Sequence, residues 1–238
     1  MRISVAIIGF AALVLAGWGV PRASAEIVDL ELVLAVDVSG SVDEEEAELQ
    51  RAGYVAALTN AQVIRAIKGG RHGRIAVTYV EWAGDHIQRP VLDWAVIKGE
   101  ATAADFAGRL ARAPITTEMW TSISGMMAYA QTRFRESPHR GRRRVLDISG
   151  DGPNNDGLIV TGPRDRTIAE GIIINGLPII NNRPSRFGTP PMPNLDHYYE
   201  DCVIGGFGAF IVVADTYRDF ARAIRRKLIL EIAGRTPP

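Results

Sequence analysis

The sequence predicts an α/β protein built around a mostly parallel sheet. Short apolar, β-branched runs alternate with longer helical patterns along the chain. The first of these runs ends abruptly in polar residues, as a buried strand does where it reaches a loop. Hydrophobic residues make up 47% of the chain and charged residues 23%, which suits a globular core.

The first 25 residues read as an export signal. Arg2 gives a positive n-region, 5–16 form an apolar stretch, and Ala23-Ser24-Ala25 matches a cleavage site. The stretch is short against the roughly 20 residues of a membrane span. We therefore expect a signal peptide at 1–25, a domain over 26–234 without a membrane span, and a periplasmic or secreted protein.

Charge and cysteine content narrow the function classes. Lys+Arg and Asp+Glu both number 27, so no basic excess points to nucleic acid. The arginine-rich stretch 140–144 is expected to be a solvated loop. Cys202 is the only cysteine, which excludes an internal disulfide, and we expect a buried, inert thiol.

The first half of the chain predicts a β-α-β-β-α order. A buried strand starts at Leu30 and stops at Asp37-Val38-Ser39-Gly40-Ser41. The acids at 43–46 suit the N-terminus of the helix that follows, and Pro90 suits an edge strand. The expected elements are a helix over 42–67 ended by Gly69-Gly70, a hairpin of strands over 74–83 and 88–94, and a helix over 102–112 capped by Thr102.

The second half continues the alternation. The expected elements are a helix from 121–125 to about 134, a strand over 144–149, a helix over 164–175, a strand over 177–180, a proline-rich loop over 181–194, a helix over 195–203, a strand over 207–214 and a last helix from 215 or 216. In that last helix, helical spacing predicts a buried stripe. Its members are Tyr217, Phe220, Ala221, Ile224 and Leu228.

Oxygen-bearing side chains follow the first strand. Asp37, Ser39 and Ser41 fall at the carboxyl end of a parallel strand, the edge where open α/β sheets bind ligands. They suggest part of a divalent-cation site. An alternative is that Asp37 and Ser39 only shape the turn, while Ser41 caps the next helix through the pattern Ser41-Val42-Asp43-Glu44.

Two further loops, each following a predicted strand or preceding a predicted helix, also carry oxygen-bearing side chains, Thr121 in one and Asp151 in the other. Together with Asp37, Ser39 and Ser41 they provide two carboxylates and three hydroxyls. Hard cations take oxygen ligands, so this set suits Mg²⁺ or Mn²⁺. Zinc is a poor candidate, because the four histidines are scattered without ligand spacing.

Taken in order, three motifs resemble the von Willebrand factor type A domain with its metal-ion-dependent adhesion site. They are Asp37-Val38-Ser39-Gly40-Ser41, Thr121-Ser122-Ile123-Ser124-Gly125 and Ser149-Gly150-Asp151-Gly152. The resemblance spans residues 26–234 and implies a doubly wound sheet with one short antiparallel edge strand and helices on both faces. The chain is also similar to a group of secreted bacterial proteins of this fold whose function is uncharacterised.

The resemblance also implies roles for the site residues. Ser39, Ser41 and Thr121 would bind the cation directly or through water, while Asp37 and Asp151 would hold its waters. An open coordination position would accept an acidic side chain from a protein partner. Two points stay open: a shift of one residue would make Ser122 the ligand instead of Thr121, and Asn154, Asn155 and Asp156 either tighten the rim or only form a turn.

Three functions remain under consideration. The first is an exported, non-catalytic module that captures a partner carboxylate through Mg²⁺ or Mn²⁺. The second is a Mg²⁺-dependent hydrolase with Ser39 or Asp37 as nucleophile, which requires a positioned base. The third is a purely structural metal site that holds three loops together. Binding is favoured because no general base is evident.

Overall fold

The structure is a computed structural model that describes residues 25–181, 184, 188 and 190–235. The predicted signal peptide therefore lies outside the described residues except for Ala25. Of the proline-rich loop predicted over 181–194, residues 182, 183, 185–187 and 189 lie outside them as well.

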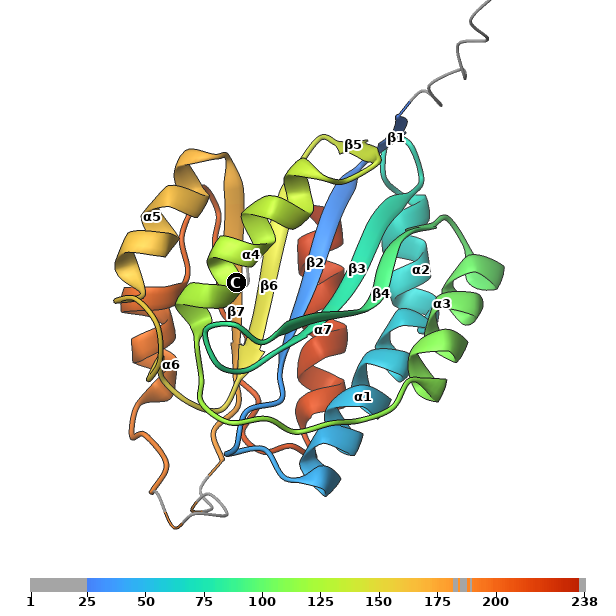
Figure 1. The fold of residues 1–238 in the computed structure, drawn as a ribbon. Coiled ribbons are helices and arrows are strands. Elements are labelled where there is room, and N and C mark those ends of the chain that lie inside the picture. Colours follow the sequence, from blue (N-terminus) through green and yellow to red (C-terminus); the bar gives the residue numbers. More distant parts are fainter. Residues whose placement is uncertain (1–24, 182–183, 185–187, 189, 236–238) are drawn as a thin grey trace, which may run out of the picture.

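A five-stranded sheet forms the centre of the molecule (Figure 1). Its strand order is β4-β3-β2-β6-β7, with only β4 antiparallel. The predicted fold class, a mostly parallel sheet with helices on both faces, is confirmed. The antiparallel edge strand is not short, however, since it has 10 residues. The strands are β2 (Leu30–Asp37), β3 (Ile75–Trp82), β4 (Gln88–Ile97), β6 (Arg144–Gly150) and β7 (Ile172–Pro178).

Helices cover both faces of this sheet because the central strand β2 is apolar on both sides. Leu32 and Leu34 face one core cluster, and Val33 and Ala35 face the other. The first face is covered by α1 (Glu44–Leu58), α2 (Ala61–Lys68), α3 (Glu100–Arg112) and α7 (Phe220–Ala233). The second is covered by α4 (Ile123–Arg135), α5 (Thr161–Ala169), α6 (Leu195–Tyr198) and the π-helical turn η1 (Tyr199–Val203).

A separate two-stranded parallel sheet joins β1 (Glu26–Val28) to β5 (His139–Gly141). It lies at the end of the molecule where β2 begins, opposite the carboxyl ends of the parallel strands (Figure 1). Among the described residues, no helix is long and apolar enough to cross a membrane.

The predicted helix over 42–67 is wrong in that it is two helices. Asn60 interrupts it, because its Oδ1 accepts a hydrogen bond of 2.8 Å from Gln62 N and so caps α2. The helix α1 starts at an Asp43–Glu46 capping box, with Asp43 as N-cap. Ser41 therefore does not cap this helix, which removes that alternative. The acids at 43–46 stand in the first turn as expected.

Other boundaries also differ from the prediction. Thr102 does not cap α3, whose N-cap is Gly99. The helix predicted over 164–175 ends at Ala169, because Gly171 adopts φ 74 and Ile172–Pro178 then pairs with β6. The predicted strand over 207–214 is not formed, and the segment makes only isolated bridges, from Ile211 to Gly176 in β7 and from Ala214 to Ile179 just after β7.

The last helix begins later than predicted, at Phe220. Its buried stripe includes Phe220, Ile224 and Leu228 as expected, but Ala221 is exposed and Ala223 is buried in its place. Tyr217 is buried from the preceding turn. Cys202 is a free thiol that is only partly buried.

Candidate metal centre

The carboxyl ends of β2 and β6 bring the predicted site residues to one edge of the sheet. Asp37 is the last residue of β2, and Asp151 follows directly after β6. The two strands are neighbours with Val36 in register with Ser149. Residues more than a hundred positions apart therefore begin their loops side by side.

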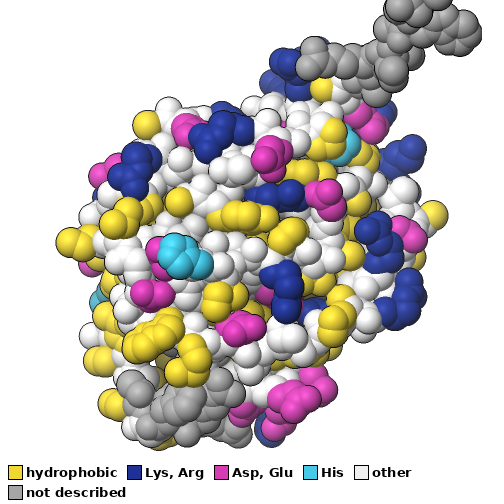
Figure 2. Space-filling view, viewed as in Figure 1, with side chains coloured by type: hydrophobic (Ala, Val, Ile, Leu, Met, Phe, Trp, Pro, Cys, Tyr) yellow, Lys and Arg dark blue, Asp and Glu magenta, His cyan; other side chains and the backbone are white. Residues whose placement is uncertain are grey.

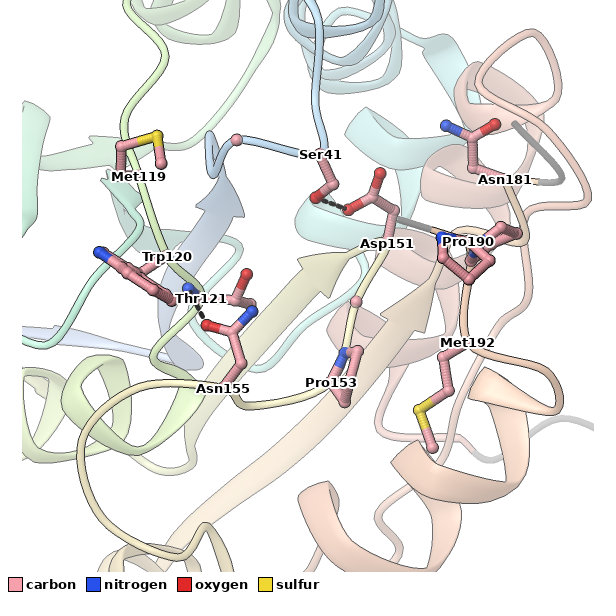
Figure 3. A pocket seen from close by; sticks show the side chains of 13 residues that line it. Ser41, Met119, Trp120, Thr121, Asp151, Pro153, Asn155, Asn181, Pro190 and Met192 are labelled. Atoms are coloured by element: carbon pink, nitrogen blue, oxygen red, sulfur yellow. Dashed lines mark hydrogen bonds between the residues drawn. The ribbon is translucent and has the colours of Figure 1, made fainter. Parts of the chain in front are cut away.

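Three of the five residues make a continuous chain of contacts. Ser39 Oγ and Ser41 Oγ lie 3.1 Å apart, and Ser41 Oγ donates a hydrogen bond of 2.5 Å to Asp151 Oδ1. Figure 3 shows Ser41 and Asp151 facing each other across this contact. The structure thus gathers two hydroxyls and one carboxylate from two loops.

Asp37 lies beneath this chain and is fully buried. Its Oδ1 accepts a hydrogen bond of 2.7 Å from Ser39 N, whereas its Oδ2 has no hydrogen-bond partner among the described residues. Burial, followed by the nearby carboxylate of Asp151, raises the pKa of Asp37 to about 8. Burial also raises the pKa of Asp151. Two buried carboxylates that oppose each other's ionisation are stabilised as anions by a cation.

Thr121 lies on the opposite side of the same hollow, one residue after Trp120 (Figure 3). Its backbone is fixed by Asn155, whose Oδ1 accepts from Thr121 N at 2.8 Å and whose N donates to Thr121 O at 2.8 Å. Thr121 is almost fully buried, and no hydrogen bond engages its hydroxyl among the described residues. That hydroxyl is available to a ligand.

Ser122, the alternative to Thr121, is used elsewhere. Its Oγ accepts from Gly125 N at 3.1 Å and so caps α4, and it donates to Asp156 O at 3.0 Å. Ser122 does not line the hollow that Thr121 lines. The arrangement favours Thr121 as the residue directed to the site.

Side chains of the loop after β6 tie it to the first turn of α4 and to the turn between β3 and β4. Asn154 Oδ1 accepts from Ser124 N at 2.9 Å, and Asp156 Oδ2 accepts from Asp85 N at 2.8 Å. Asn155 alone lines the hollow. Asn154, Asn155 and Asp156 therefore connect the loop after β6 to α4, to Thr121 and to the β3–β4 turn, which is more than forming a turn.

Sequence reasoning missed two tyrosines beside the carboxylates. Tyr199 is fully buried, and its hydroxyl has no hydrogen-bond partner among the described residues. A Cβ at Gly150 would lie 2.8 Å from both this hydroxyl and Asp37 Oδ2, so glycine leaves space between them. Tyr217 is also buried, and after burial the nearby Asp151 and Asp37 contribute to raising its pKa. No signal near the motifs in the sequence pointed to either tyrosine.

The residues fit a hard cation. A buried carboxylate oxygen without a partner, a second carboxylate and three hydroxyls give an oxygen-only donor set of the kind that Mg²⁺ and Mn²⁺ prefer. No group of three or more His, Cys, Asp or Glu side chains able to hold a metal is found in the described part of the chain.

Comparison with known proteins identifies a matching family and solved structures with a similar fold. The profile of a family described as "Protein of unknown function (DUF1194)" matches residues 27–236. No curated protein sequence matches the chain. Among solved structures, a von Willebrand factor type A protein from Catenulispora acidiphila has a TM-score of 0.55 at 14% identity, covering 87% of this chain and 43% of that one.

Two other similar structures are larger proteins. Proximal thread matrix protein 1 from the mussel byssus, solved with a zinc-occupied MIDAS motif, has a TM-score of 0.62 at 13% identity, covering 88% of this chain and 49% of that one. The pilus adhesin SpaC from Lactobacillus rhamnosus GG has a TM-score of 0.60 at 13% identity, with coverages of 87% and 30%. The chain thus spans half or less of the length of these relatives. It has the fold of a von Willebrand factor type A domain.

Proposed function

The chain belongs to the DUF1194 family of proteins of unknown function, and we propose that it is an exported, divalent-cation-dependent protein-binding module of the adhesion type. The cation is Mg²⁺ or Mn²⁺, held by Asp37, Ser39, Ser41, Thr121 and Asp151. The partner is a protein that presents an acidic side chain.

One observation supports this proposal most directly. The Ser39–Ser41–Asp151 contacts lie next to the buried Asp37, which accepts from Ser39 N through Oδ1 and whose Oδ2 has no hydrogen-bond partner among the described residues. Buried polar atoms are usually hydrogen-bonded, and an exception requires an explanation such as an ion. A cation bound here would give the Asp37 oxygen a partner and would offset the burial that raises the pKa of the two carboxyls.

When bound, the cation would offer an open coordination position to a partner carboxylate. The chain's own residues prepare that position. Asn155 holds the backbone of Thr121 in place, and Gly150 leaves the space around Asp37 Oδ2 free of a side chain. The hollow above them has a volume of about 330 Å³, enough for a side chain from a partner.

Hydrolysis is less well supported than binding. A hydrolase that uses Ser39 or Asp37 needs a general base within hydrogen-bonding reach. The residues that line the hollow, as far as the chain is described, include neither histidine nor lysine, and Asp151, the carboxylate among them, is assigned to the cation. A structural metal site is the remaining alternative, and it makes a different prediction for partner binding.

Calorimetric titration of the cation-stripped mature protein with Mg²⁺ and with Mn²⁺ tests the site. We expect saturable binding by the wild type and none by an Asp37→Ala/Ser39→Ala variant. A Thr59→Ala variant, altered at an exposed position away from the site, is the matched control and should bind as wild type. Equal binding by the double variant would exclude these residues as ligands.

A second titration separates adhesion from a structural metal. The cation-loaded protein is titrated with a short peptide that carries one glutamate, and with the same peptide carrying glutamine. Adhesion predicts binding of the glutamate peptide alone, abolished by chelator. A structural site predicts that chelator lowers thermal stability while neither peptide binds.

A further inference from the structure

Trp120 stands out on the surface beside the proposed cation. Its side chain is 60% exposed although it is the residue immediately before Thr121. It also adopts φ 67, and Asn194 is the only other described non-glycine residue with positive φ. An aromatic residue in this backbone region is strained, and such strain concentrates at functional sites.

The surrounding backbone holds Trp120 in this conformation. Glu118 N donates to Val38 O at 2.8 Å, and Gly84 N donates to Met119 O at 3.1 Å. On the other side, Thr121 is bonded to Asn155 and Ser122 N donates to Ala83 O at 2.7 Å. Because both neighbours are fixed, the chain directs the indole outward instead of into the core.

Further apolar side chains surround the same hollow, and together with Trp120 they are called the apolar rim here. Met119 and Met192 are 45% and 37% exposed, and Pro153, Pro190 and Pro191 line the same hollow. In Figure 3, Met119 and Trp120 lie on one side of Ser41 and Asp151, and Pro190 and Met192 lie on the other. Figure 2 shows apolar side chains scattered over this face, with one group at its lower left, and Figure 1 places the carboxyl ends of the parallel strands at the lower end.

We infer that the partner segment carries a large apolar side chain next to the acidic residue, and that Trp120 and Met192 hold this side chain. The inference rests on the proposed function, because the acidic residue is the one that the cation captures. The further inference specifies the kind of residue that stands next to this acidic residue in the partner. The proposed cation accepts the partner's carboxylate at the bottom of the hollow. The apolar side chains around the hollow contact the side chain next to the acidic residue.

The composition of the rim supports a protein segment as the occupant. Tryptophan and methionine are enriched at the centres of protein interfaces, and tryptophan in particular contributes most to binding there. Methionine adapts its shape to a range of apolar side chains. A small carboxylate such as acetate would occupy the floor and leave the rim exposed to water.

Selection from a random heptapeptide library displayed on phage tests the inference. The cation-stripped full-length mature protein is immobilised, loaded with Mn²⁺, exposed to the library and eluted with chelator. Selections run in parallel on wild type, Trp120→Ala and Ile159→Ser. Ile159 is 83% exposed but does not line the hollow, so it is a matched control for loss of an exposed apolar side chain. Circular dichroism and Mn²⁺ titration establish that each variant is folded and binds the cation.

We expect wild type and Ile159→Ser to enrich an aspartate or glutamate next to an aromatic or long aliphatic residue. Trp120→Ala should keep the acidic preference, lose the apolar one, and bind the selected peptides at least tenfold more weakly. Enrichment of the acid with no preference beside it would overturn this inference and leave the proposed function standing. Peptides without any acidic preference would overturn both.

Gel filtration tests whether a second copy of the chain, instead of a partner protein, covers the hollow. If wild type is a dimer and Trp120→Ala is a monomer, a second copy of the chain covers the rim, and the inference is wrong. We expect the two proteins to elute at the same position.

Discussion

Ser41 Oγ donates a 2.5 Å hydrogen bond to Asp151 Oδ1, although 110 positions separate the two residues in sequence. The bond joins the loop after β2 to the loop after β6. Both side chains are assigned to the same proposed cation, and this contact places an oxygen of each loop side by side.

Cation binding should stabilise the protein through Asp37. A ligand that binds only the native state at a hundred times its Kd adds about 2.7 kcal/mol of stability. We expect Mn²⁺ to raise the thermal midpoint of wild type and to leave that of Asp37→Asn unchanged, as measured by calorimetric melts with cation or chelator. Asp105→Asn, a change at an exposed carboxylate on α3, should respond like wild type. An Mn²⁺ response retained by Asp37→Asn would contradict the assignment.

Changing Thr121 and Ser122 to alanine should have different effects on Mn²⁺ affinity and on stability. Thr121→Ala is expected to weaken Mn²⁺ affinity at least tenfold with little change in stability. Ser122→Ala should leave the affinity within a factor of two, but destabilise the fold by about 1 kcal/mol because the N-cap of α4 is lost. Titration and urea denaturation on both variants measure the two effects. The reverse pattern would show that Ser122 is the ligand.

Lys227 should be essential for stability. It is fully buried and contacts two buried carboxylates, Asp147 Oδ1 at 2.5 Å and Glu231 Oε1 at 2.6 Å. Lys227→Met leaves both acids without their cation, and breaking a buried ion pair in this way typically costs 3–5 kcal/mol, so we expect a loss of about 4 kcal/mol in urea denaturation.

The exposed pair of Lys68 with Glu100 is the control for that experiment. Lys68→Met should cost about 1 kcal/mol or less. If the two lysine variants lost similar stability, the buried cluster would not be the cause.

Stability should depend on pH through Asp147. Burial, followed by the nearby Glu231, raises the pKa of Asp147 to about 7 from an ordinary value of 3.8. Between these two pH values the native state holds a proton that the unfolded state has released. The contribution of this group to stability is therefore fully present below about pH 4 and is lost as the pH rises through about 7.

Urea denaturation of wild type and Asp147→Asn at pH 5.5 and pH 8 measures this contribution. Wild type should lose more stability than the variant between the two pH values, because asparagine does not titrate. Parallel profiles for the two proteins would show that Asp147 does not titrate in this range.

Much of the site could be predicted from sequence because its residues follow strand ends. Asp37 and Asp151 each come directly after a buried apolar run, and parallel strands place such positions at one edge. Thr121 could be placed only by motif order. Its position in the fold depends on its two hydrogen bonds with Asn155. From sequence alone, Asn155 could equally be explained as a turn-forming residue.

The errors in the fold have local physical causes. Asn60 ends a helix that periodicity alone continues, because its side chain caps the next one. Around Gly171, a helical pattern and a β-branched run overlap in the sequence. Pairing with β6 makes the residues after Gly171 a strand instead of a continuation of the helix. Tyr199 and Tyr217 could not be foreseen beside Asp37, because tertiary packing alone brings the last third of the chain to that edge.

The position of β1 has a practical consequence for any surface on which the protein is displayed. Glu26 begins at the end of the molecule opposite the hollow (Figure 1). A tether attached ahead of this residue would hold the domain upright, with Trp120 and Asp151 facing away from the support. A tag placed there therefore leaves the binding face unobstructed, whereas coupling through loops near the hollow would mask it.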